Sequence, residues 1–182
     1  MEVISGMSNY LVITAVGEDQ PGIVKRLSHT ITEHSCNIED SRMSILGGEF
    51  AMILLLSGNW NDIAKLENAL PKAGTAMSLK ITCKHTEARQ PRPDQRTYQV
   101  EVLAVDQPGI VHQVSEFFAR REINIDSLNS ESYNAAHTGT PMFALTLALN
   151  IPKKQAIADL RDDFLDFCDS LNLDGVIEAV RT

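Results

Sequence analysis

The hexapeptide DQPGIV occurs at residues 19–24 of this 182-residue chain and again at residues 106–111, 87 positions later. A repeat of six consecutive residues indicates a duplication rather than chance. The match extends further at the same offset, because Asn37-Ile38 aligns with Asn124-Ile125. Two copies are too few to build a solenoid, so the sequence predicts two globular units of similar fold.

The first half of each copy predicts a strand, a helix and a hairpin. Residues 11–16 and 98–105 are rich in β-branched residues and precede the hexapeptide as strands. Pro-Gly ends each strand and opens a helix, with Pro in its first turn and apolar residues at helical spacing after it. Residues 42–46 and 49–57 predict two strands, joined in the first copy by a tight turn at Gly47-Gly48.

The second half of each copy predicts one more helix and one more strand. The helices are indicated by apolar residues at helical spacing, and the last strands fall at residues 77–83 and 176–180. The order βαββαβ therefore occurs twice. We expect an α+β protein with two ferredoxin-like domains, each an antiparallel four-stranded sheet with two helices on one face.

The chain divides accordingly into four segments. We expect an N-terminal extension at residues 1–8, a first domain at 9–85, a linker at 86–96 and a second domain at 97–182. The linker contains two prolines and no large apolar residue, a composition typical of a spacer between domains.

Composition and charge exclude several classes of protein. The net charge is −8, and Lys and Arg form no stripe, which argues against direct binding of nucleic acid. No apolar run is long enough to span a membrane and no secretory signal is evident, so we expect a cytoplasmic protein. The three cysteines are scattered and predict reduced thiols.

No motif predicts catalysis, a metal or a cofactor. The five histidines share no metal-ligand spacing, and neither a phosphate-binding glycine motif nor a nucleophile motif is present. Cys36 falls near a helix end and aligns with Ile123, which favours a core or boundary position. A run of acidic residues lies around the second helix of the second copy, where solvation and contact with a basic partner both remain open: Asp162, Asp163, Asp166 and Asp169.

The repeated loop has two interpretations. It can be a turn only, with the Asp side chain capping the helix. It can also bind a ligand, because a helix N-terminus offers free N–H donors and partial positive charge to a carboxylate, while the Asp binds an ammonium group. Gly lacks a Cβ, so a ligand can approach the backbone closely. The expected ligand is then a zwitterionic amino acid. Its candidate site residues are Asp19, Gln20, Pro21, Gly22 and Ile23, and in the second copy Asp106, Gln107, Pro108, Gly109 and Ile110.

Asn37 and Asn124 are candidates for the same site. Each is 15 residues after its Gly, where the first helix ends and the next strand begins. A turn or C-cap role is common for Asn at such a place. Its side-chain amide can alternatively donate to a ligand carboxylate.

These residues resemble the ACT domain family over residues 9–85 and 97–182. The resemblance rests on DQPGIV followed by Asn-Ile, found twice, together with the βαββαβ order. It implies amino-acid binding at interfaces between paired domains. The chain departs from serine-binding members at Gly17 and Ala104, where a ligand-contacting His can stand, so the resemblance does not identify the ligand.

A chain made only of two such domains is similar to the group of transcriptional repressors of the glycine cleavage system. That similarity implies a non-enzymatic, cofactor-free regulator that binds an amino acid such as glycine and contacts a DNA-binding activator protein. The alternative is a ligand-free assembly module that regulates a metabolic enzyme or a transporter. Open sheet edges predict that copies of the chain pair, as a homo-oligomer.

Overall fold

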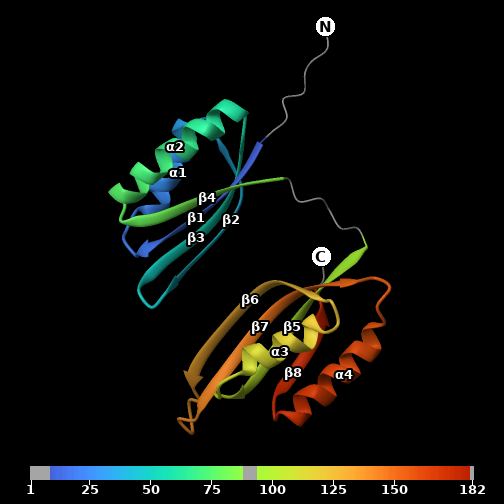
Figure 1. The fold of residues 1–182 in the computed structure, drawn as a ribbon. Helices are drawn as coiled ribbons and strands as arrows, with labels where there is room; N and C mark the ends of the chain where they lie inside the picture. The colour runs from blue at the N-terminus through green and yellow to red at the C-terminus, as the bar shows by residue number, and fades with distance from the viewer. Residues whose placement is uncertain (1–8, 88–93, 181–182) are drawn as a thin grey trace. The chain divides into compact units, whose positions relative to one another are not determined.

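The computed structural model describes residues 9–87 and 94–180, in two compact units (Figure 1). The first unit comprises β1 (Asn9–Glu18), α1 (Ile23–Glu33), β2 (Asn37–Leu46), β3 (Glu49–Gly58), α2 (Trp60–Ala76) and β4 (Leu79–Thr86). The second comprises β5 (Gln95–Val105), α3 (Ile110–Ala119), β6 (Asn124–Asn134), β7 (Pro141–Pro152), α4 (Ile157–Ser170) and β8 (Asp174–Ala179).

Each unit forms one antiparallel four-stranded sheet. The strand orders are β2-β3-β1-β4 and β6-β7-β5-β8, so the first and third strands of each unit lie at the centre. This confirms the predicted pair of ferredoxin-like βαββαβ folds, in which a hairpin keeps the second and third strands adjacent and the helical crossovers separate the other sequential strands.

The two units share their irregularities as well as their topology. The pairing register shifts between Ile38 and Asp40 on β2 and between Ile125 and Ser127 on β6, which are the same places at an offset of 87. A shift of this kind is a β-bulge, which inserts one unpaired residue and bends the strand. The duplication therefore extends to the backbone geometry of the strand that follows the first helix.

The core of each unit lies between the sheet and its two helices. Alternate residues of the central strand, such as Leu11 and Ile13 on β1, are fully buried against apolar residues of α1 such as Leu27. In the second unit, Phe118 and Phe164 join α3 and α4 over the sheet, with ring centroids 5.3 Å apart. Figure 1 shows the helices of each unit on one side of its sheet. We call the opposite side the open face.

Strands extend into both ends of the predicted linker at residues 86–96. Thr86 pairs with Tyr10 as the last residue of β4, and Gln95 pairs with Pro152 as the first residue of β5. Backbone pairing with a neighbouring strand therefore continues through polar residues at both ends of the predicted linker. The predicted extension at residues 1–8 and the prolines of the linker lie outside the described residues.

Several element starts also differ from the prediction: β1 begins at Asn9, β2 at Asn37 and β8 at Asp174, each earlier than predicted. The helix α1 begins at Ile23 with Gly22 as its N-cap, so Pro21 precedes the helix instead of occupying its first turn. The strand β4 begins at Leu79 rather than residue 77, because Met77 caps α2 and Ser78 takes a φ of 56°. In the part of the chain that the structure describes, no helix is long and apolar enough to cross a membrane.

Candidate ligand-binding site

The repeated loops connect the first strand of each unit to its first helix, and a backbone hydrogen bond fixes each of them. The N–H of Asp19 donates to the carbonyl oxygen of Gly48 at 3.1 Å, and the N–H of Asp106 donates to that of Pro141 at 2.9 Å. Gly48 precedes β3 and Pro141 begins β7. Each loop is therefore held at the end of the sheet where the second and third strands are joined.

The glycine of each loop is required by its backbone conformation. Gly22 has a φ of 86° and Gly109 a φ of 99°, both in the left-handed region that L side chains rarely adopt. Each is the N-cap of its helix, and neither cap has a side-chain hydrogen bond. The predicted capping by Asp19 and Asp106 is therefore wrong, because the chain turns into the helix at the glycine, three residues beyond the Asp.

The uncapped helix starts leave donors and an acceptor close together in each loop. The first turn of a helix has N–H groups without intrahelical partners and carries partial positive charge. The carboxylates of Asp19 and Asp106 are exposed and hydrogen-bond to no described residue. No atom lies within 4 Å of a Cβ built on Gly22 or Gly109, so the space beside the backbone is open. The arrangement can accept an ammonium group and donate to a carboxylate.

The other loop residues divide between surface and core. Pro21 and Pro108 are exposed, as is Gln107, whereas Gln20 is half-buried. The side chains of Ile23 and Ile110 pack in the cores, each only 2% exposed, and anchor the helix starts. The side chains of these two isoleucines are therefore not available to a ligand, and the N–H of Ile23 already donates to the carbonyl oxygen of Gln20 at 3.5 Å.

The structure does not bring the asparagines to the loop of their own unit. Asn37 pairs with Ser57 at one end of β3, whereas Glu49 at the other end of β3 pairs with Glu18, next to the loop. Eight residues of strand separate these ends, about 27 Å at a rise of about 3.4 Å per residue. Asn124 has the equivalent place on β6, opposite Asn150 of β7. One ligand cannot touch both the loop and the Asn of a single unit.

The predicted site residues did not include an acidic residue that lies two positions after each asparagine. Glu39 is the bulged residue of β2, and its carboxylate accepts hydrogen bonds from the Ser57 hydroxyl and from Nδ2 of Asn37, the latter at 3.0 Å. The Ser57 and Asn37 hydrogen bonds hold the pKa of Glu39 below its usual value. Asp126 is the equivalent residue of β6. The alignment of the two copies at an offset of 87 could have identified this pair, since both copies have an acidic residue at this position.

The position two residues before each loop Asp has no room for a ligand-contacting side chain. A Cβ on Gly17 would lie 2.3 Å from the carbonyl oxygen of Ser78. Ala104 is 5% exposed and belongs to the core of the second unit. The loops must therefore hold a ligand with their backbone and their Asp side chains, without a His at this position.

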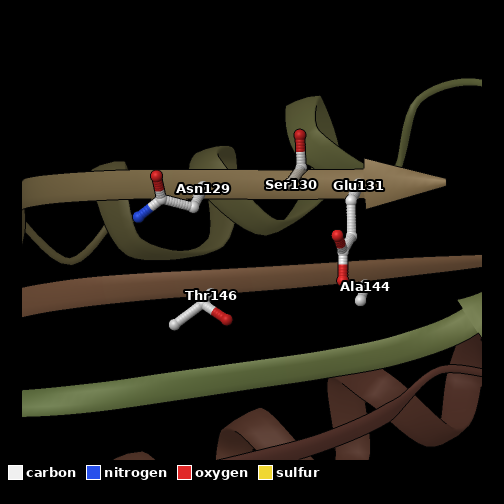
Figure 2. Close-up of a pocket in the computed structure, with 5 residues that line it drawn as sticks. All are labelled: Asn129, Ser130, Glu131, Ala144 and Thr146. Carbon is white, nitrogen blue, oxygen red and sulfur yellow. The ribbon is translucent and has the colours of Figure 1, made fainter. Parts of the chain in front are cut away.

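Among the described residues of the second unit, two hollows are lined without any residue of the loop. One, of about 270 Å³, is on the open face and is lined by Asn129, Ser130, Glu131, Ala144 and Thr146 (Figure 2). The other, of about 360 Å³, lies between α4 and β8, where Nε of Arg161 donates to the carbonyl oxygen of Ile177 at 3.0 Å.

The cysteines are placed as structural residues. Cys36 and Cys168 are buried and Cys83 is half-buried, all with free thiols. Burial raises the pKa of each thiol, that of Cys168 to about 11. These thiols stay protonated near neutral pH and are poor nucleophiles. Among residues 9–87 and 94–180, no group of three or more His, Cys, Asp or Glu side chains is placed to hold a metal ion.

Comparison with known proteins assigns the two units to one class of regulatory domain. The ACT domain family matches residues 9–84, and an ACT domain match also covers residues 98–132. The fold and the repeated loop thus define a protein with two ACT domains.

The relatives narrow this class. The glycine cleavage system transcriptional repressor of Escherichia coli is 36% identical over 173 residues, which cover 95% of this chain and 91% of that protein. A UPF0237 protein of Methanococcus maripaludis is 39% identical over 77 residues, 41% of this chain and 86% of that protein. The chain therefore belongs to the ACT domain family, and within it to the family of the glycine cleavage system transcriptional repressor.

Solved structures agree over the whole length. A crystal structure assigned provisionally as a glycine cleavage system transcriptional repressor has a TM-score of 0.74 and 28% identity, covering 97% of this chain and 99% of that chain. A protein of unknown function from Galdieria sulphuraria has a TM-score of 0.79 and 29% identity, covering 96% and 99%. The named full-length relatives are regulators, so the chain is a regulatory ACT protein.

Proposed function

We propose that the chain is an amino-acid-responsive repressor of transcription that binds a DNA-binding activator protein instead of binding DNA. The observation that carries this proposal is the 36% identity to a transcriptional repressor over 95% of the chain. That relative is a transcriptional repressor of the glycine cleavage system, so glycine is the first ligand to test.

The loop geometry supports the amino-acid part of the proposal. Both loops offer free helix N–H groups and an unpaired Asp carboxylate beside open space at glycine. Glycine carries one ammonium and one carboxylate group and no side chain, which suits a site with no other donor nearby. If Asn37 or Asn124 also contacts the ligand, a second ACT domain must supply it, since each lies at the far end of its own unit.

The activator part rests on charge and on the relative. With a net charge of −8, the chain lacks the clustered Lys and Arg side chains that phosphate binding requires. Repression without DNA contact needs a protein target. For glycine to control the binding of this protein target, glycine must bind the free chain and the activator-bound chain with different affinities.

Two measurements test the proposal. Calorimetric titration with a panel of amino acids should show binding of glycine or a close analogue. A pull-down with the purified activator of the glycine cleavage genes should show binding that changes when glycine is added. A chain that binds neither an amino acid nor the activator contradicts the proposal.

The second candidate is a ligand-free assembly module that regulates a metabolic enzyme or transporter. It is favoured by one observation, that a hollow with room for a partner's side chain lies on the open face of the second unit, away from the loop. Partner binding that ignores every amino acid in the panel would support this candidate.

A further inference from the structure

The open face of the second unit carries four carboxylates. Glu101 on β5, Glu131 on β6, and Asp174 and Glu178 on β8 are all exposed. The strand registers place all four on the open face. Glu101 pairs with Val176, Asp174 with Leu103, Glu178 with Gln99 and Glu131 with Ala144, and these pairs alternate along the strands with pairs that face the core. None of the four forms an ion pair with a described residue, and no Lys or Arg of the described strands β5 to β8 shares the central part of this face.

The first unit does not share this charge. The registers identify the equivalent residues of the first unit as Thr14, Ser44, Lys80 and Lys84. Two acidic positions of the second unit are therefore basic in the first, and two are neutral. The fold alone needs no acid here, since the same sheet forms with lysines. The acidic charge is specific to the second unit.

The same face exposes large apolar side chains among the carboxylates. Leu103 is 43% exposed, Val105 58%, Tyr133 44% and Val176 42%. In the sheet, Val176 pairs with Glu101, and Leu103 pairs with Asp174. Apolar side chains gathered on a sheet face mark a contact surface, and charges around them set the choice of partner.

The hollow in this face has room for a side chain of a partner. It forms because β7 carries the small residues Ala144 and Thr146 where neighbouring strands carry longer ones. Figure 2 shows the Glu131 side chain extending from β6 toward Ala144, with Asn129 on the same strand. The lining offers carboxylate, amide and hydroxyl oxygens, which are acceptors for a Lys or Arg head group.

We propose that the open face of the second unit is the docking surface for a basic, partly apolar surface of a protein, namely the Lys- and Arg-rich surface with which a DNA-binding protein contacts DNA. This inference rests on the proposed function for the identity of that protein. Charge complementarity selects this partner surface, because a surface that neutralises phosphates carries clustered cations. The four carboxylates attract such cations, since none of them forms an ion pair with a described residue, although Glu101 accepts a hydrogen bond from Nε2 of Gln99 at 2.7 Å. Docking on this face makes the chain compete with DNA for the same surface of the DNA-binding protein.

The acidic side of α4 is the rival surface and serves as the control. Asp162 and Asp166 are exposed there, but Asp163 is already paired with Arg121 at 2.9 Å. The double substitution Glu101→Lys with Glu178→Lys and the double substitution Asp162→Lys with Asp166→Lys change the net charge equally. Only the first pair lies on the open face.

The test is the affinity of each full-length variant for the purified activator of the glycine cleavage genes. We expect the open-face variant to bind at least about tenfold more weakly, about 1.4 kcal/mol, and the α4 variant to stay close to the unsubstituted chain. Excess operator DNA should displace the unsubstituted chain. Equal effects of the two variants, or a ternary complex with DNA, overturn the inference while leaving the proposed function in place. Thermal melts confirm that both variants fold.

A second probe decides the inference if the activator does not bind at all, an outcome that would refute the activator part of the proposed function. The probe is a synthetic peptide of alternating Lys and Leu, added to the isotopically labelled full chain. We expect amide chemical shifts to change on β5 and β8 and not on β1 and β4. Changes confined to α4 or to the first unit, or no changes, overturn the inference.

Discussion

The carbonyl oxygen of Ser78 lies directly against the Cα of Gly17, so close that a Cβ on Gly17 would be 2.3 Å away. Gly17 pairs with Leu79 near the end of the sheet that carries the first loop. Ser78 has a φ of 56°, which turns the chain sharply from α2 into β4. This close approach removes any side chain from the position two residues before Asp19, and so defines what the loop can offer a ligand.

Gly17→Ala should destabilise the first unit. Real Cβ atoms do not approach a backbone oxygen to 2.3 Å, so the strand or the turn at Ser78 must move. Overpacking of this kind typically costs about 1–3 kcal/mol. Urea denaturation measures the loss. A Gly17→Ala variant as stable as the original chain would contradict the explanation.

Asp19→Asn and Asp106→Asn should weaken amino-acid binding without weakening the fold. Neither carboxylate caps its helix, and both are exposed, so we expect stability to change by less than about 0.5 kcal/mol. Loss of a hydrogen bond to a charged ammonium group costs about 1.5–3 kcal/mol, roughly 10- to 100-fold in affinity. Calorimetry with glycine and urea denaturation measure the two effects.

The control for these substitutions is Glu33→Gln, which removes the same charge at the far end of α1. It should leave glycine affinity unchanged. A loss of stability of more than about 1 kcal/mol in either Asp variant would instead restore the capping role.

Gly22→Ala and Gly109→Ala should each destabilise the protein by about 1–2 kcal/mol, because both glycines have left-handed backbone conformations. Gly→Asn at the same positions should cost less, since Asn visits this conformation more readily. Thermal melting distinguishes the two. An Ala variant as stable as the original chain would contradict the observed turn.

The fold was predictable because the helices and strands have strong hydrophobic periodicity and because the same order of elements occurs in both copies of the repeat. Where a boundary was wrong, the cause was a backbone feature that residue type does not reveal. Ser78 adopts a left-handed φ without being Gly, and Gln95 pairs as a strand residue despite its polar side chain. Periodicity reports which residues face the core, and it says little about where pairing stops.

The sequence indicated the two loops of the candidate site, but it did not show that each asparagine lies far from the loop of its own unit. The sequence predicted the two loop glycines as points of ligand access, which stays a prediction, and the structure adds that their φ values require glycine. The separation of Asn37 from Asp19 follows from topology, since α1 carries the chain to the other end of the sheet before β2 begins. Motif matching alone groups residues by sequence and overlooks this distance.

The free energy of unfolding should fall as the pH rises from about 9 to about 11. Burial raises the pKa of Cys168 from 9.0 to about 11, so the unfolded chain loses this proton before the folded chain does. Stability from the protonated thiol is complete below the unfolded pKa and is lost as the pH passes the folded pKa. Urea denaturation across this pH range measures the fall. Cys168→Ala should make it shallower, and an unchanged slope would exclude Cys168 as its cause.

The purified chain alone should not bind operator DNA specifically. Its net charge is −8, and the four carboxylates on the open face of the second unit would repel phosphates. A gel-shift series with operator DNA should show a shifted band only when the activator is present, and that band should change when glycine is added. Because phosphate contacts release counterions, any DNA binding by the chain would weaken steeply as salt increases, and titration at several salt concentrations would reveal it. A sequence-specific shift by the chain without the activator would overturn a mechanism that acts through a protein.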